Sequence, residues 1–294
     1  MAARISVVAG AVGFFAGVWY NKVQTPSSFE VFAGNALLPT PAEPMDISVS
    51  GDYLNKVQEF GLTNPDTLSF RKSFILSYDR RNRVPNWVFE HLTKDHIKHN
   101  ENINRSKSEF FEDLSIHPYF RSTNSDYKRS GFDRGHLAAA GNHRCRQDFL
   151  DDTFVLSNIT PQVGKGFNRD AWNNLEKHVR HQVKKYQNVY VCSGPLYLPR
   201  METDGKKYVK YQVIGKNNVA VPTHFFKVVV YETENREFDM ETYVMPNTVI
   251  DENVPLKSFL VPKDVIERNA GFLVFQNIPS TVFRTINGHK AHRA

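Results

Sequence analysis

The stretch Gly131-Phe-Asp-Arg-Gly-His-Leu-Ala-Ala-Ala-Gly-Asn-His-Arg144 carries more chemistry than any other part of this sequence. Asp133, Arg134 and His136 place a carboxylate, a guanidinium and an imidazole within four positions, and Gly135 allows the backbone to turn sharply there. An imidazole with a pKa of about 6.5 can accept a proton at neutral pH, and an arginine can bind phosphate oxygens. Taken alone, the motif is equally consistent with a solvated, charged turn.

A second polar group lies in residues 166–180, Gly-Phe-Asn-Arg-Asp-Ala-Trp-Asn-Asn-Leu-Glu-Lys-His-Val-Arg. Apolar residues recur here at helical spacing, which predicts an amphipathic helix over 169–185. Its predicted buried stripe consists of Trp172, Leu175, Val179 and Val183. Asn168 is predicted to cap the helix, while Glu176 and Arg180 fall at the margin of the buried face. A capped helix with an ordinary i,i+4 ion pair would also explain this segment alone.

Together the two segments indicate a phosphodiesterase site with one metal ion. Mg²⁺ keeps several waters and needs only one or two protein oxygens, so the Asn168 amide oxygen can serve as the protein ligand. His136 would activate the attacking water as general base, and Arg134 and Arg180 would neutralise charge on the phosphoryl oxygens. Glu176 could anchor a metal-bound water or orient Arg180, and the residues alone do not decide between these roles.

Three motifs in this order and spacing resemble the DNA/RNA non-specific endonucleases, which have a ββα-metal (His-Me finger) fold. The motifs are Asp133-Arg-Gly-His136, Leu156-Ser-Asn-Ile-Thr-Pro-Gln162 and Asn168 with Trp172-Asn-Asn-Leu-Glu176. Tyr211-Gln-Val-Ile-Gly215 and Val219-Ala-Val-Pro-Thr-His-Phe-Phe-Lys227 are similar to a mitochondrial branch of that family. The resemblance covers roughly residues 55–285 and shows no departure at a catalytic position.

The resemblance implies a role for each matching position. His136 matches the general base, Asn168 the direct ligand of Mg²⁺ (with Mn²⁺ as a possible substitute), and Glu176 an acidic residue that holds the metal through water. Arg134 and Arg180 match the arginines that stabilise the phosphate.

Two further positions match less defined roles. Asn158 matches a catalytic-site polar residue, and Asp133 is expected to fix the turn or an arginine. His143 has no matching role, and we interpret it as a polar or DNA-facing side chain.

The same resemblance implies a Mg²⁺-dependent, sugar-non-specific endonuclease that hydrolyses double- and single-stranded DNA and RNA to 5′-phosphate products. It further implies a homodimer in mitochondria, in the intermembrane space, with relocation to the nucleus possible. Roles in apoptotic DNA fragmentation and mitochondrial DNA turnover follow from it, and the identity of any protein inhibitor is left open.

Charge supports a polyanionic substrate. The 294-residue chain has a formal charge of +6 and a pI of about 9.1. Between residues 121 and 185 there are 12 Lys and Arg against 7 Asp and Glu, so much of the excess surrounds the motifs. The candidate nucleic-acid-binding side chains are Lys128, Arg129, Arg146 and Arg169. Cys145 and Cys192 lack the spacing of a zinc site or a disulfide framework.

The predicted fold class is α+β, a central antiparallel sheet with flanking helices around a ββα-metal core. Residues 1–22 are predicted to be a targeting segment whose apolar run is too short for a confident membrane span, so the mature form should have no stable span. Residues 23–50 read as a proline-containing linker, 51–286 as the nuclease domain and 287–294 as a disordered tail.

Individual elements follow from local composition. A short helix is predicted over 262–270. Strands are predicted, from β-branched and aromatic runs, at 74–78, 87–91, 153–156, 189–193, 209–214, 224–231 and 242–245.

Two rival functions remain open from the residues alone. A catalytically silent nucleic-acid-binding module would account for the basic charge, although the intact His136 and Asn168 argue against it. A hydrolase with a serine nucleophile is disfavoured because the chain contains no Gly-x-Ser-x-Gly motif.

Overall fold

The computed structural model describes residues 68–98 and 100–291. The predicted targeting segment 1–22, the linker 23–50 and the predicted domain start at residue 51 all lie outside the described residues.

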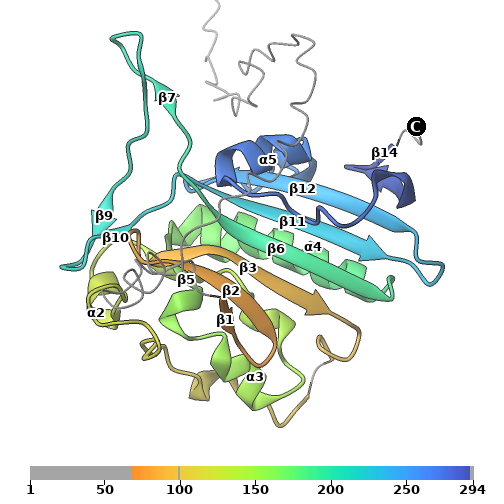
Figure 1. The fold of residues 1–294 in the computed structure, drawn as a ribbon. Helices are drawn as coiled ribbons and strands as arrows, with labels where there is room; N and C mark the ends of the chain where they lie inside the picture. The colour runs from red at the N-terminus through yellow and green to blue at the C-terminus, as the bar shows by residue number, and fades with distance from the viewer. Residues whose placement is uncertain (1–67, 99, 292–294) are drawn as a thin grey trace, which may run out of the picture. The chain divides into compact units, whose positions relative to one another are not determined.

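A large sheet organises the described residues, with eight strands in the order β1-β2-β3-β6-β11-β12-β13-β14 (Figure 1). Neighbouring strands are antiparallel except for β12 and β13, which are parallel. The strands are β1 Leu68–Phe70, β2 Phe74–Asp79, β3 Val84–Leu92, β6 Asn188–Leu196, β11 His224–Glu232, β12 Phe238–Pro246, β13 Phe283–Ile286 and β14 His289–Lys290. The predicted α+β class with a mainly antiparallel central sheet is confirmed.

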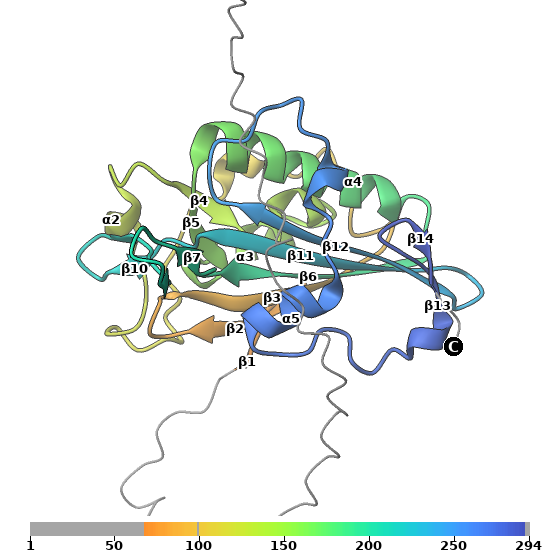
Figure 2. The ribbon, with the colours of Figure 1, turned by 90° about the horizontal axis from the view of Figure 1, so that it is seen from above.

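The two faces of this sheet are covered by different layers because successive strand side chains point to opposite sides. Helix α4, Trp172–Val183, packs on one face, and helix α5, Lys263–Ala270, lies on the other (Figure 2). Strand β11 illustrates the alternation: Val229 packs with the α4 residue Val179, whereas Val230 packs with the α5 residue Ile266. The sheet is therefore buried on both faces, and a polar side chain on either face must find a partner inside the protein.

A small two-stranded ladder lies beside α4 and supplies the first two elements of the ββα unit. β4, Asp133–His136, pairs antiparallel with β5, Ile159–Gln162, so that His136 lies opposite Ile159. The chain then enters α4 through a wide helical turn, η4, Gly164–Ala171. This order brings the two polar groups of the sequence together, and Asp133 contacts Asn168 although they are 35 positions apart in the sequence.

The remaining elements are short. They are η1 Arg105–Lys107, α2 Asn124–Tyr127, η2 Ala140–Asn142, α3 Gln147–Asp152, η3 Leu156–Asn158, β7 Arg200–Met201, β8 Lys207–Tyr208, β9 Val213–Ile214, β10 Val219–Ala220, η5 Leu256–Phe259 and η6 Ser280–Val282.

Most sequence-based elements are confirmed, with ends that extend beyond the apolar runs. The four residues of the predicted helical stripe are all buried in α4, and Pro262 immediately precedes α5. The strand predicted at 153–156 is wrong, because α3 ends there and η3 begins. Of the strand predicted at 209–214, only Val213–Ile214 forms, because the preceding residues are exposed and lack a buried face to favour extended pairing.

Three local expectations need correction. Asn168 does not cap a helix, because it lies inside η4 and its backbone N–H donates to the Val163 oxygen at 2.9 Å. The predicted tail is ordered through residue 291, since Asn287 bonds to Thr242 and β14 completes the sheet edge. Gly135 lies in strand β4 and not in a turn. Within residues 68–98 and 100–291, no helix has the length and apolarity required to cross a bilayer.

Candidate active site

Asp133 joins the two halves of the site. Its carboxylate accepts two hydrogen bonds from Arg169, at 2.7 and 2.6 Å, and one from the Asn168 Nδ2 at 2.9 Å. The Arg169 guanidinium, with a further contribution from Asn168, lowers the pKa of Asp133 despite the opposing effect of partial burial. Asp133 therefore stays ionised at neutral pH and links strand β4 to the turn that precedes α4.

The contact with Asp133 also orients the Asn168 amide. A carboxylate only accepts hydrogen bonds, so the Nδ2 group must face Asp133 and the Oδ1 atom must point elsewhere. The residue is half-buried, and an amide oxygen is a hard ligand of the kind that Mg²⁺ accepts. Among the described residues no group of three or more His, Cys, Asp or Glu side chains could hold a metal ion.

His136 is buried at the end of β4, with 9% of its surface exposed. Its ring contacts Phe154, at 4.8 Å and nearly perpendicular, and Phe110, at 5.3 Å, and these two rings also contact each other at 4.9 Å. Burial lowers the pKa of His136 to about 3, and the nearby charges of Arg105 and Arg134 act in the same direction. The Nε2 atom is buried and has no hydrogen-bond partner among the described residues. A neutral imidazole with an unused ring nitrogen is suited to accept a proton from water.

The glycine before His136 is required by packing. A Cβ atom at Gly135 would lie 2.1 to 2.5 Å from the side chain of Gln162, which is fully buried on the paired strand β5. Gly135 therefore leaves room for the buried Gln162 side chain, whereas the sequence suggested a sharp turn.

Asn158 supports the backbone that follows His136. Its side chain accepts from the Ala138 N–H at 2.9 Å and donates to the backbone oxygens of Ala138 and Thr153, at 3.1 and 2.8 Å. The residue has no exposed surface. These bonds occupy its polar atoms, so the Asn158 side chain holds together the backbone of Ala138 and Thr153 near His136.

Glu176 and Arg180 lie together on α4, with 3.8 Å between the Oε2 and Nη1 atoms. Burial raises the pKa of Glu176, while the charges of Lys227 and Arg180 oppose that shift. Arg180 also donates from Nη1 to the Asn142 Oδ1 at 3.1 Å, and only 22% of its side chain is exposed. The guanidinium is therefore fixed in place before any substrate binds.

Arg134 has a different environment. It is exposed on β4, donates to the Asn124 Oδ1 at 2.6 Å and stacks over the Phe110 ring at 4.2 Å. Because Phe110 also contacts His136, this stacking keeps the Arg134 charge beside the imidazole.

Sequence reasoning missed Arg105. This exposed residue of η1 is close enough for its charge to affect the pKa values of His136, Glu176 and Arg180. It lies in a polar loop with no periodic pattern, and its only signal in the sequence is a positive charge.

The four candidate nucleic-acid-binding residues fall into two classes. Lys128 and Arg129 are exposed after α2, and no ion pair ties either of them among the described residues. Arg169 is held by Asp133, and Arg146 forms an ion pair with Asp148 at 2.7 Å. All four reach solvent, but only the first pair is free to follow a nucleic-acid backbone.

The interpretation of His143 as a DNA-facing side chain is wrong. His143 has no exposed surface, and its Nε2 atom lies 3.0 Å from the Glu90 Oε1. Glu90 is likewise fully buried, on strand β3. The sequence signal for this contact was Glu90 itself, which lies between the buried Val88 and Leu92 on the inward face of its strand. An acid in a buried strand requires partners.

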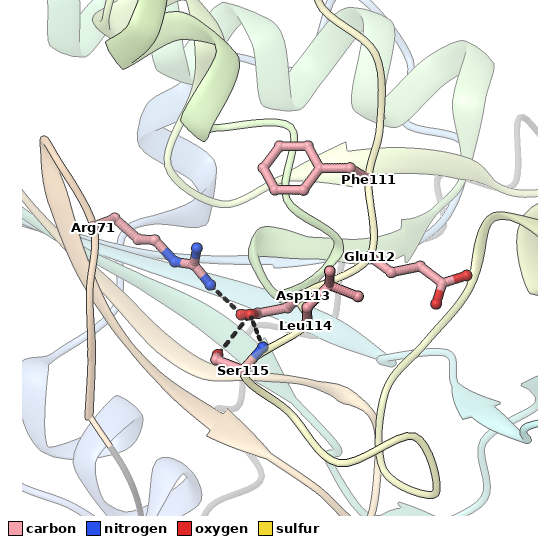
Figure 3. Close-up of a pocket in the computed structure, with 6 residues that line it drawn as sticks. All are labelled: Arg71, Phe111, Glu112, Asp113, Leu114 and Ser115. Carbon is pink, nitrogen blue, oxygen red and sulfur yellow. Dashed lines mark hydrogen bonds and ion pairs between the residues drawn. The ribbon is translucent and has the colours of Figure 1, made fainter.

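A hollow of about 550 Å³ lies away from these residues (Figure 3). It is lined by Arg71, Phe111, Glu112, Asp113, Leu114 and Ser115. At its base, Asp113 accepts hydrogen bonds from Arg71, from Ser115 and from the Ser157 hydroxyl. Since Ser157 precedes Asn158, we interpret this cluster as a support for the η3 turn rather than as a catalytic site.

Known proteins match this chain in family, in sequence and in fold. The model of the family described as DNA/RNA non-specific endonuclease matches residues 55–281. Mitochondrial endonuclease G of Caenorhabditis elegans is 53% identical over 78% of this chain and 74% of its own length. The Homo sapiens protein of that name is 53% identical over 76% of this chain and 74% of its own length. The crystal structure of an EndoG/EndoGI complex matches with a TM-score of 0.76 and 55% identity, covering 83% of this chain and all of that one.

Proposed function

The chain belongs to the DNA/RNA non-specific endonuclease family and is an endonuclease, and on this premise we propose that it hydrolyses phosphodiester bonds with His136 as general base. The observation that carries the proposal is the buried Nε2 of His136, which has no hydrogen-bond partner within residues 68–98 and 100–291 and belongs to an imidazole that its pKa of about 3 keeps neutral. A base must be unprotonated before the reaction, and this one meets that requirement throughout the physiological pH range.

Nucleic acids are the substrates of this family, and its ββα-metal architecture implies a divalent metal cofactor. We propose Mg²⁺, with Mn²⁺ as a substitute, held directly by the Asn168 Oδ1 and through water by Glu176. The residues fit such an ion, because the Asn168 Oδ1 is not used in the bond to Asp133 and Glu176 adds a carboxylate. When bound, the ion would polarise the phosphate and stabilise the leaving oxygen.

The two arginines have separable roles in this proposal. Arg180, fixed by Asn142, faces the charge that grows on the phosphoryl oxygens, because a donor that needs no reorganisation stabilises the transition state best. Arg134, exposed and stacked on Phe110, binds the same phosphate from the solvent side. Asp133 and Asn158 act on Asn168 and on the His136 backbone, respectively, and have no contact with substrate.

Non-specific recognition follows from the kind of contacts available. Lys128 and Arg129, with Arg146 and Arg169, would bind the sugar-phosphate backbone, which is common to double- and single-stranded DNA and to RNA. We propose 5′-phosphate products for both sugars.

The cellular assignments rest on relatives. Proteins named as mitochondrial support a mitochondrial location, and we propose the intermembrane space, with relocation to the nucleus during apoptotic DNA fragmentation and a role in mitochondrial DNA turnover. We propose a homodimer as the assembled form. A protein inhibitor is a candidate partner, because the solved relative is EndoG in a complex that inhibits it.

A plasmid-nicking assay tests the proposal. The parent protein should convert supercoiled DNA to open circles with Mg²⁺ and stop when EDTA is added, and His136→Ala should bind DNA without cleaving it. A catalytically silent binding module would not cleave under any condition, and cleavage that resists EDTA would contradict the metal-dependent mechanism.

A further inference from the structure

Three buried polar side chains point from the sheet toward α4, and the proposed reaction uses none of them. They are Glu90 on β3, Ser193 on β6 and Lys227 on β11, each with 1% or less of its surface exposed. Lys227 donates to the Ser193 hydroxyl at 2.5 Å and lies 4.6 Å from the Trp172 ring. Burial of charged groups is costly unless they have partners, so their positions demand an explanation.

Glu90 has two partners, and both belong to the segment that follows the catalytic strand β4. Its Oε1 atom accepts from the Asn142 Nδ2 at 2.9 Å and lies 3.0 Å from the His143 Nε2. Asn142 is 2% exposed, at the end of η2, and His143 is fully buried. One carboxylate oxygen thus fixes two consecutive side chains to the central sheet.

Asn142 passes this constraint to α4. An amide has a donor end and an acceptor end, and Glu90 can only accept, so the Nδ2 group must face Glu90. The Oδ1 atom is then directed at Arg180, whose Nη1 donates to it at 3.1 Å. An amide turned the other way would present a donor to a guanidinium that can only donate.

The space around Arg180 leaves little room for another arrangement. A Cβ atom at Gly141 would lie 2.8 Å from the Arg180 Nη1, so the guanidinium packs directly on the η2 backbone. The same Nη1 atom also lies 3.8 Å from the Glu176 Oε2. We propose that Glu90 is a positioning residue for the cleavage reaction, which holds Arg180 in its catalytic orientation through Asn142. This inference rests on the proposed function, in which Arg180 stabilises the reacting phosphate.

Glu90→Gln tests the inference with little change of volume. Glutamine is uncharged and can present a donor as well as an acceptor, so it holds the Asn142 amide less firmly than the carboxylate does, and Asn142 in turn holds Arg180 less firmly. We expect kcat to fall about 10- to 10²-fold, the range that a misplaced catalytic group produces, with DNA affinity nearly unchanged. Asn142→Ala should produce a similar kcat loss by removing the link itself.

Glu241→Gln is the matched control. Glu241 lies on the same face of the sheet and holds the same helix, but through His178 at 2.8 Å and through two tyrosines. If Glu90 only stabilised the helix, both glutamine variants would lower the free energy of unfolding, and neither would lower kcat. We expect the loss of kcat in Glu90→Gln and Asn142→Ala only.

A double-mutant cycle with Arg180→Ala identifies the route. Once the guanidinium is absent, Glu90→Gln should change kcat by less than twofold. An equal loss in the parent and in the Arg180→Ala background would overturn the inference, as would an unchanged kcat in Glu90→Gln.

A crystal structure of Glu90→Gln gives a readout independent of activity, in which the Asn142–Arg180 bond should be lost or its geometry altered. If that bond is altered while Arg180→Ala leaves kcat unchanged, the catalytic role of Arg180 fails and the contact route stands. If the bond is intact, the positioning inference fails and the proposed function is unaffected.

Discussion

The two arginines of the site occupy contrasting regions. Arg134 lies on the exposed edge formed by β4 and Phe110, where its partners are an aromatic ring and one amide. Arg180 lies against the buried polar layer under α4, where Asn142, Glu176 and the Gly141 backbone surround it. The exposed side chain can adapt to the path of a flexible polyanion. The buried side chain is fixed, so its free-energy contribution can be concentrated in the transition state.

The largest effect on kcat should come from the substitution of His136. His136→Ala should lower kcat by about 10² to 10⁴, as expected for loss of a general base, because the substitution removes the imidazole proposed to accept the proton of the attacking water. DNA affinity, measured by titration in EDTA, should barely change. A kcat within a few-fold of the parent value would show that another group activates the water.

The buried arginine should show the next largest effect. Arg180→Ala should lower kcat by about 10² to 10³, the range seen when a preorganised donor to a reacting phosphate or oxyanion is removed. Single-turnover rates at saturating DNA would measure it. Arg180→Lys keeps the charge but loses the planar fork that bonds to Asn142, so it should recover little of the rate. If Arg180→Ala changed only the affinity for DNA, Arg180 would bind substrate as the exposed region does, without a specific role in the transition state.

The dependence of activity on Mg²⁺ concentration should show whether Asn168 is the metal ligand. Asn168→Ala should raise the Mg²⁺ concentration needed for half-maximal activity by about 10- to 100-fold or more, because even outer partners of a metal site have effects of that size. Asn168→Asp should retain part of the response, since a carboxylate is also a hard oxygen ligand. An unaltered Mg²⁺ titration for Asn168→Ala would exclude this residue as the ligand.

The burial of His136 also predicts a pH effect on folding. Its pKa is lowered to about 3 in the folded protein, so between that value and about 6.5 the unfolded chain binds more protons and acid favours unfolding. On going from pH 7 to pH 5 this residue should remove about 2 kcal/mol of stability. Urea unfolding of the parent and of His136→Ala at both pH values isolates the effect. Equal losses in the two proteins would mean that His136 is hydrated in solution.

The smallest effect should be at the exposed edge. Arg129→Ala should leave kcat nearly unchanged and reduce the slope of log affinity against log salt by about one contact, because Arg129 is exposed and would bind only the backbone. Arg169→Ala is the comparison, since Arg169 is already paired with Asp133 and its removal should also disturb Asn168. A kcat loss in Arg129→Ala would place it closer to the scissile phosphate than the structure suggests.

Much of the fold could be read from the sequence because it depends on local periodicity. The stripe that includes Trp172 and Val179 is buried as predicted, since helical spacing alone puts these residues on one face. The strand at 153–156 was wrong because an apolar run of four residues is equally compatible with a buried helical turn. The β4–β5 ladder was not expected, since Asp133–His136 carries no alternating pattern.

The sequence by itself determined which groups are available for the chemistry. The Asp133-Arg-Gly-His136 box and the Asn168 to Arg180 segment contain the proposed general base, the proposed metal ligand and the two arginines, because residue type and spacing are local properties of the chain. Only the tertiary structure decided how those groups are held: that Asp133 orients Asn168, that burial lowers the pKa of His136, and that Glu90 reaches Arg180 through Asn142. These contacts join positions 35 to 52 residues apart, and sequence spacing does not specify which distant side chains become neighbours or which of them lose water.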